Sequence, residues 1–396
     1  MKKSLLALAA LGAFAGAAQA QSSVTLYGVI DAGVNYVSSV HAKPKAKGGR
    51  QFSLTSGVMQ GSRWGVRGTE NLGGGLKAIF TLENGFELNN GRLGQGGSEF
   101  GRQAFVGLSG DFGTVTVGRQ YDSIADFVGG FAAGSQWGAY AAHPSDLDNF
   151  NNGARINNSI KYTSPNNGGF TYSALYSLGG VAGEFQKNRT WSVGAGYANG
   201  PLAFGAAYLN AMNPNLSIYG NTSADGGIAK SFANNSILHG FASASTLEVV
   251  GVGGAYTFGP ATVGLTYSNV KLKDLNDNRS DAAGHNTFAG SPKFNNGEVN
   301  LSYQLTPALK VGTAYSYTES NSVGYNGSDE KTSKAKFHQV NLGADYSLSK
   351  RTDVYALGAY QKVCGGSELV AAQINGLEPS RNKRQAVVRV GLRHKF

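Results

Sequence analysis

Apolar and polar residues alternate with a period of two along most of the chain. Val24, Leu26 and Ile30, for example, alternate with Thr25 and Asp31. The same alternation returns over residues 76–83, 170–178, 263–267, 311–317 and 386–393. Such strict alternation is typical of β-strands that bury one face, because successive side chains of a strand point to opposite sides. The pattern therefore predicts an all-β fold.

Short and long connectors separate the predicted strands, and the two kinds alternate along the chain. The short connectors have tight-turn residues such as Gly, Pro, Asn and Asp, and they cover residues 71–75, 109–113, 165–169, 198–201, 258–260, 305–307 and 348–351. The long ones are polar and cover residues 38–50, 86–99, 122–153, 179–189, 211–245, 272–293, 319–336 and 364–383. Seven short turns and eight long loops separate about sixteen strands. The strands must then run up and down, with all short turns at one end.

One apolar face on every strand is at odds with the hydrophilic character of the whole chain. No apolar run of helical membrane-spanning length follows the first twenty residues. A closed antiparallel barrel with an apolar exterior and a hydrated interior satisfies both observations, and closure pairs every backbone amide. We therefore predict a transmembrane β-barrel of sixteen antiparallel strands, formed by one domain over residues 21–396. A short helix is expected over residues 123–127 of the long third loop.

The N-terminus has the composition of an export signal. Lys2 and Lys3 precede an apolar stretch over residues 5–15, and Ala18 and Ala20 form a small-x-small cleavage site. This pattern is typical of a secretory signal peptide over residues 1–20. Its removal would lower the formal net charge from +10 to +8. The single cysteine, Cys364, leaves no possibility of an intramolecular disulfide, and we expect it to be passive.

Several segments resemble one family of membrane proteins. Residues 23–31, 62–70, 101–108 and 118–121 resemble strands of the trimeric general-diffusion porins of Gram-negative outer membranes, of the anion-preferring type. The last strand also matches and ends on Phe396. The resemblance implies a sixteen-stranded barrel, a homotrimer, and a third loop (residues 122–153) that folds inward and constricts the lumen. It further implies an outer-membrane location, contact with outer-membrane lipid and lipopolysaccharide, and recognition of Phe396 by the assembly machinery.

The same resemblance implies a basic wall opposite the inward-folded loop. By motif the wall arginines are Arg63, Arg102 and Arg155. Arg63 alternates with the apolar Trp64, which independently predicts that Arg63 faces the lumen. Arg155 alternates with Ile156 and Ile160, which predicts the same orientation for Arg155. Arg102, however, has the parity of the apolar residues that follow it, so its inward orientation rests on the resemblance alone. Further lumen-facing candidates are Arg67, Lys77 and Lys161.

The third loop carries its acids away from its tip. Residues 127–140 contain no carboxylate, whereas Asp122 and Asp126 lie at the root of the loop. A passive channel for small hydrophilic solutes with a modest preference for anions is therefore expected, and its solutes would be mainly anionic. Ion pairs of the arginines with Glu83, Asp31 or Glu70 would cancel this preference. A substrate-specific porin, a non-conducting adhesin and a barrel enzyme are competing interpretations of the same pattern.

Signals for other chemistry are weak. The six histidines do not have the spacing of metal ligands, so we expect no metal site. The oxygen-rich segment 274–281 lacks the glycine and terminal glutamate of a calcium loop, although Ca²⁺ binding there remains open. Lys and Arg are scattered over strands and loops, which argues against nucleic acid as a partner. We expect no cofactor and no enzymatic activity.

Overall fold

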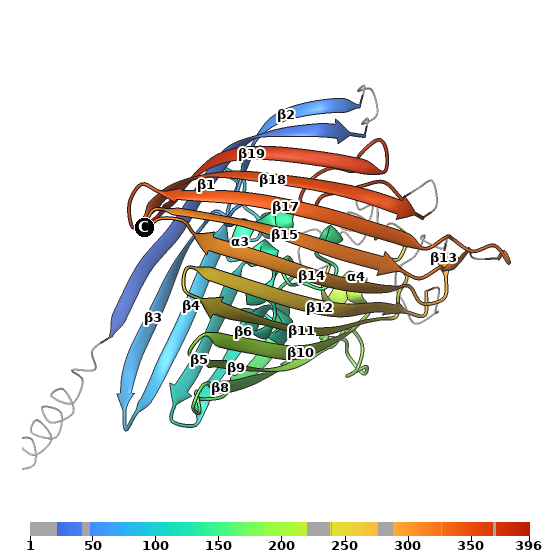
Figure 1. Cartoon of the computed structure of the whole chain (residues 1–396). Coiled ribbons are helices and arrows are strands. Elements are labelled where there is room, and N and C mark those ends of the chain that lie inside the picture. Colours follow the sequence, from blue (N-terminus) through green and yellow to red (C-terminus); the bar gives the residue numbers. More distant parts are fainter. Residues whose placement is uncertain are drawn as a thin grey trace, which may run out of the picture.

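The computed structural model describes residues 22–41, 48–219, 238, 240–275, 288–325, 327–366 and 370–396. The predicted signal peptide (residues 1–20) and most of the oxygen-rich segment 274–281 lie outside these residues. The described chain forms one closed antiparallel β-barrel, shown in Figure 1. No helix among the described residues is long and apolar enough to cross a membrane.

Each barrel strand pairs with the next strand along the chain, and β19 pairs with β1 to close the barrel. β2 pairs with the second half of β1 and β3 with the first half, so these two form one interrupted barrel strand, and the barrel has sixteen strands as predicted. The strands are β1 (Ser23–Val40), β2 (Gly49–Ser56), β3 (Arg63–Gly73), β4 (Leu76–Gly85), β5 (Gln103–Gly110), β6 (Gly113–Gln120), β7 (Ile156–Thr163), β8 (Phe170–Ser177), β9 (Thr190–Asn199), β10 (Leu202–Met212), β11 (Thr246–Phe258), β12 (Ala261–Lys273), β14 (Lys293–Gln304), β15 (Leu309–Ser320), β17 (Ala335–Ser347), β18 (Thr352–Gly365) and β19 (Arg384–Lys395).

Short and long connectors alternate as the sequence predicts. The seven predicted short turns join β3–β4, β5–β6, β7–β8, β9–β10, β11–β12, β14–β15 and β17–β18. The C-terminus lies at the short-turn end (Figure 1). At the other end, the two-residue strands β13 (Phe288–Ala289) and β16 (Gly324–Tyr325) pair two long loops, and short helical turns η1 (Gln95–Gly97) and α4 (Pro214–Ser217) lie in others.

The exterior of the barrel is apolar. Val24, Leu265, Leu342 and Val390 are 60–69% exposed, although each lies within a regular, fully paired strand. Their neighbours along the strands point inward and are buried or polar. This is the arrangement that a strand needs when its outer face contacts lipid and its backbone is fully paired.

The interior is not uniformly polar, and here the expectation of a hydrated interior is wrong in part. Leu209, Val249, Leu272, Phe294 and Phe337 point inward and are at most 3% exposed. They belong to one apolar cluster with residues of the third loop. One side of the barrel interior is therefore a dry core that holds this loop against the wall.

The third loop folds into the barrel, as predicted. It contains α2 (Ser123–Phe127), η2 (Gly129–Phe131), α3 (Ala133–Trp137), η3 (Ala139–Ala141) and η4 (Pro144–Asp146). The predicted helix over residues 123–127 is confirmed. Its N-terminus is capped by Asp122, whose carboxylate accepts hydrogen bonds from the backbone N–H groups of Ile124 (2.7 Å) and Ala125 (3.1 Å).

Inward-facing glycines in the wall make room for the aromatic side chains of this loop. A Cβ atom at Gly194 or Gly196 would meet the Phe127 ring, and one at Gly312 or Gly343 would overlap the Trp137 ring. These glycines come from β9, β15 and β17, so the loop reaches across the barrel. Glycine is needed at these positions for close approach of the loop rather than for strand bending.

Candidate functional site

One carboxylate lies at the centre of a group of basic side chains on the wall opposite the docked loop. Glu83 of β4 is 4% exposed. Arg102 donates from Nε to Glu83 Oε1 (2.7 Å), and Arg63 Nε of β3 lies 3.5 Å from Oε2. Tyr27 of β1 donates to Oε2 (2.9 Å). Two of the three predicted arginines thus share one acid, which confirms in part the ion pairing that the sequence left open.

Arg102 points into the lumen although its parity in the sequence suggests the opposite. It precedes β5, which begins at Gln103, so the alternation of that strand does not extend to it. Besides Glu83, it contacts Tyr121, since its Nη2 donates to the Tyr121 hydroxyl (3.2 Å). Its contacts with Glu83 and Tyr121 agree with the orientation that the resemblance implied, which alternation could not indicate.

Arg155 is the third member of the predicted set, and its charge is the least compensated of the three. It is 5% exposed and lies over the Tyr121 ring, 5.6 Å from the ring centre. Its Nη1 donates to the Gly153 carbonyl (3.0 Å), while its buried Nε has no hydrogen-bond partner among the described residues. The part of the chain that the structure describes offers it no carboxylate within ion-pair distance.

Alternation is misleading at the start of β7. It groups Ile156 with the outward Ile160, but Ile156 is fully buried in the core beneath the third loop. Asn158 has a positive φ of 51°, and the pairing of β6 with β7 shifts register between Gly118 and Gln120. A bulge of this kind reverses which side chains point inward.

Sequence reasoning missed Arg119, which lies beside Arg155. Its Nε donates to the Gly101 carbonyl (2.8 Å) and its Nη1 to Asn157. In the sequence it has the parity of the exposed Val117, so alternation did not indicate it as a candidate. The register shift at Gly118 is the reason why parity is misleading at this position. The only sign of the shift in the sequence is Gly118 itself, whose φ is 137°.

The remaining candidates have different surroundings. Lys161 pairs with Asp126 at the root of the loop and donates to the Tyr121 carbonyl (3.0 Å). Arg67 lies over the Tyr27 ring, 5.4 Å from its centre. Lys77 is exposed next to the short turn that joins β3 to β4. Asp122 is fully buried as a helix cap.

The charge of this cluster remains positive after its ion pairs are counted. We call the cluster the basic wall, and its cations are Arg63, Arg102, Arg155 and Lys161, with Glu83 and Asp126 as its acids. Four cations against two carboxylates leave an excess of two positive charges, before the neighbouring Arg119 is counted. Asp31, another candidate partner, is engaged by the fully buried Arg389 (3.3 Å).

A buried ionic network holds the third loop in place. His143 Nδ1 lies 2.6 Å from Asp148 Oδ2, and His143 Nε2 lies 3.5 Å from Glu298 Oε2 on β14. Burial opposes protonation of His143, but the two carboxylates outweigh it and raise its pKa well above its usual value. Glu298 also accepts a hydrogen bond from the backbone N–H of Ala133 (2.7 Å). The loop is thus fixed to the wall by charge as well as by apolar contact.

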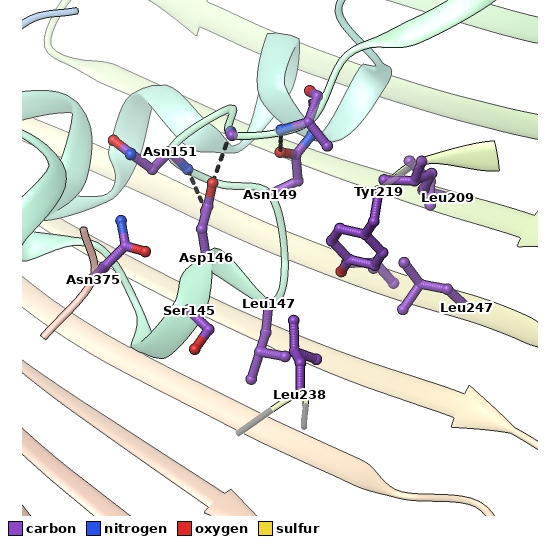
Figure 2. A pocket seen from close by; sticks show the side chains of 14 residues that line it. Ser145, Asp146, Leu147, Asn149, Asn151, Leu209, Tyr219, Leu238, Leu247 and Asn375 are labelled. Carbon is purple, nitrogen blue, oxygen red and sulfur yellow. Dashed lines mark hydrogen bonds between the residues drawn. The ribbon is translucent and has the colours of Figure 1, made fainter. Parts of the chain in front are cut away.

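A cavity of about 250 Å³ lies between the end of the loop and the wall, and Figure 2 shows the side chains that line it. Asp146 lies on its polar side and accepts hydrogen bonds from the backbone N–H groups of Asn151 (2.9 Å) and Gly153 (2.8 Å). Leu209 and Leu247 line the opposite side. Burial, reinforced by nearby Asp148, raises the pKa of Asp146 to about 7. Burial likewise raises the pKa of Asp122 to about 6.

A closed barrel with an apolar exterior, an inward-folded loop and a charged wall facing that loop defines a membrane channel of the porin class. Comparison with known proteins identifies the family. A model of the Gram-negative porin family matches residues 7–365, so the chain belongs to that family. It is therefore a passive diffusion channel of the outer membrane and not an enzyme.

Relatives match over the full length of the chain. An outer membrane porin protein of Bordetella pertussis is 32% identical over 434 residues, and outer membrane porin protein 32 of Delftia acidovorans is 32% identical over 410 residues; each match covers 100% of both chains. Among solved structures, the anion-selective porin from Comamonas acidovorans has a TM-score of 0.68 at 27% identity, covering 95% of this chain and 100% of that one.

Proposed function

We propose that this porin favours small anionic solutes and that the basic wall sets this preference. The observation that carries the proposal is the excess of two positive charges on the wall opposite the docked loop. Arg63, Arg102 and Arg155 would act together with Arg119, which extends the row of guanidinium groups. A solved relative at 27% identity is named as anion-selective, which supports the same conclusion.

The proposed mechanism is electrostatic and does not require a specific binding site. Permeating ions are confined between the loop and the wall, where fixed charges of one sign and low-dielectric walls raise the local concentration of counter-ions. A single arginine about 6 Å from an ion contributes about 0.7 kcal/mol in a water-like dielectric. Arg67 and Lys77 would extend the positive field toward the mouth at the short-turn end.

We also propose how the channel is processed and assembled. We infer that residues 1–20 are removed on export, that residues 21–396 form the single mature domain, and that three copies form a homotrimer. Phe396 continues the pairing of β19 with β1, because its backbone N–H and carbonyl exchange hydrogen bonds with Gly28 (3.1 and 3.0 Å). Its ring is 43% exposed. A terminal aromatic residue at this seam is accessible to the outer-membrane assembly machinery until the barrel closes.

The experiment that tests the proposed selectivity is the zero-current potential of the purified channel in a planar bilayer under a KCl gradient. We expect the sign of an anion-preferring channel, and we expect the triple variant Arg63→Glu, Arg102→Glu, Arg155→Glu to reverse it. Cation preference of the unmodified channel would overturn the proposal. Unchanged selectivity in the triple variant would remove the basic wall from the mechanism.

A further inference from the structure

A row of three glutamines lies on the inner face of the barrel wall, toward the end that carries the long loops. Gln339 of β17 is directly opposite Gln361 of β18 in the strand register, and Gln361 is directly opposite Gln385 of β19. All three are at most 1% exposed, and Gln361 Nε2 donates to Gln339 Oε1 (2.9 Å). Each buried amide has two donor hydrogens and an acceptor oxygen to satisfy. We call these residues the glutamine row, and their remaining partners lie on the lumen side.

Those partners belong to the last long connector, part of which turns back into the barrel. We call residues 370–382 the inner segment. Gln361 Oε1 accepts from the backbone N–H of Gln373 (2.7 Å), and Gln361 Nε2 donates to the Gln373 carbonyl (3.1 Å). Gln385 Oε1 accepts from the backbone N–H of Ile374 (2.8 Å). The wall amides thus pair with the backbone of the inner segment much as a neighbouring strand would, and they fix it against β18 and β19.

The inner segment also holds the end of the third loop. Ile374 is fully buried and belongs to one apolar cluster with Tyr140 of that loop. Asn375 Nδ2 donates to the Ala139 carbonyl (3.1 Å). Gln339 Nε2 donates to the Tyr140 carbonyl (2.9 Å). The glutamine row therefore fixes two inward-folded stretches of chain at once, the inner segment and the third loop.

The position and composition of the inner segment indicate what it controls. Asn375 lines the cavity of Figure 2 together with Asp146 and Asn151, so the inner segment lies against the third loop as well as the wall. Residues 372–377 include no acidic or basic residue. The segment therefore occupies space inside the barrel without contributing charge there. Barrels of sixteen strands enclose an aqueous channel, so the chain that folds into the lumen determines how wide that channel is.

We propose that the inner segment is a second constricting element, which sets the upper size of the solutes that pass through the channel. It fills the lumen beside β18 and β19, and it prevents residues 139–142 of the third loop from moving away from the wall. Its effect is on solute size, whereas the basic wall acts on solute charge. Either proposal can therefore fail without the other.

The test measures the size dependence of permeation by uncharged sugars, which do not respond to the basic wall. The full-length folded porin is reconstituted in liposomes, and swelling rates are compared for a pentose, a disaccharide and a trisaccharide. One variant replaces residues 373–377 with two glycines. A second variant, Gln361→Ala with Gln385→Ala, keeps the segment but removes its acceptors on the wall. The control Gln304→Ala removes an exposed glutamine from β14 near its short turn.

The readout is the ratio of the trisaccharide rate to the pentose rate, because this ratio does not depend on how much porin inserts. Heat-modifiable migration in gels establishes which variants are folded. Asn375→Ala is a milder third variant, since it removes only the side-chain bond to the Ala139 carbonyl. It keeps the proposal testable if the two larger changes prevent folding.

We expect the first two variants to raise this ratio roughly fivefold, because hindrance increases steeply as a solute approaches the width of the pore. Asn375→Ala should raise it by a smaller factor, and Gln304→Ala should leave it unchanged. The zero-current potential in a KCl gradient should keep its sign in every variant. An unchanged ratio in the folded variants would overturn the proposal, and so would a change of sign, since the segment would then act through charge.

Discussion

Glu83 is the residue through which the electrostatics of the basic wall can be tested with the least disturbance. Its carboxylate holds Arg102 and Arg63 and accepts from Tyr27. Substitution Glu83→Gln keeps an acceptor oxygen for these donors but removes one negative charge. The excess on the basic wall then rises from two positive charges to three, and we expect a stronger anion preference.

The size of the effect follows from distance and screening. A unit charge about 6 Å from a permeating ion contributes about 0.7 kcal/mol in a water-like dielectric. A Debye length of about 10 Å at 0.1 M salt reduces this to about 0.4 kcal/mol. The added positive charge favours the anion and disfavours the cation by the same amount, so the free-energy difference between the two ions changes by about 0.8 kcal/mol. The anion-to-cation permeability ratio then rises roughly fourfold.

The assay is the zero-current potential in a KCl gradient, with Glu70→Gln as the matched control. Glu70 lies on the same strand as Arg63 but has the parity of the outward Trp64, so the same loss of charge occurs outside the lumen. We expect the control to leave the potential unchanged. A Glu83→Gln channel with unaltered or more cation-selective potentials would refute the reasoning, because it would place the basic wall outside the path of the ions.

Three further predictions concern the charge of Arg155, the packing of the third loop against the barrel wall, and the dependence of stability on pH. Arg155→Gln should lower the anion preference by roughly fourfold in the same assay, since no described acid offsets this charge. Gly343→Val should displace Trp137 and destabilise the barrel by about 1–3 kcal/mol, with larger and noisier single-channel currents, whereas Gly297→Ala meets open space and should do neither. The raised pKa of Asp146 means that the folded chain retains a proton that the unfolded chain has lost, so stability should fall as pH rises from 3.8 to about 7. Asp146→Asn should reduce that fall in thermal unfolding measurements, and an unchanged pH profile would contradict the assignment.

Alternation along the chain was sufficient to predict the barrel. It predicted sixteen strands, their up-and-down order and the end at which each connector lies, because a strand with one apolar face has few other stable arrangements in a membrane. Where the backbone leaves regular strand geometry, the same signal fails. Arg102 precedes its strand, and Ile156 and Arg119 lie next to a register shift. These exceptions lie on or beside the basic wall.

The docking of the third loop could not be predicted from local pattern at all. Phe127 and Trp137 fit against glycines that lie far from them in the sequence. The ionic network that includes Glu298 joins distant positions, since Ala133 and Glu298 are 165 residues apart. Only the resemblance to known porins indicated that the loop folds inward, because the glycines and the acid have ordinary strand interpretations when they are read alone.

The third loop lies between the apolar side of the lumen and the side that carries the basic wall. Its apolar residues pack against inward-facing side chains of strands such as β10, β11 and β12, and its buried His143 and Asp148 form an ionic network with Glu298. In the function proposed above, permeating ions pass on the side formed by β3 to β7, where the basic wall lies. It follows that the loop does more than narrow the channel, because it also fixes how close a permeating ion comes to the guanidinium groups. Since the interaction falls with distance and with screening, loosening the loop at Gly343 should weaken anion preference without altering a single charge.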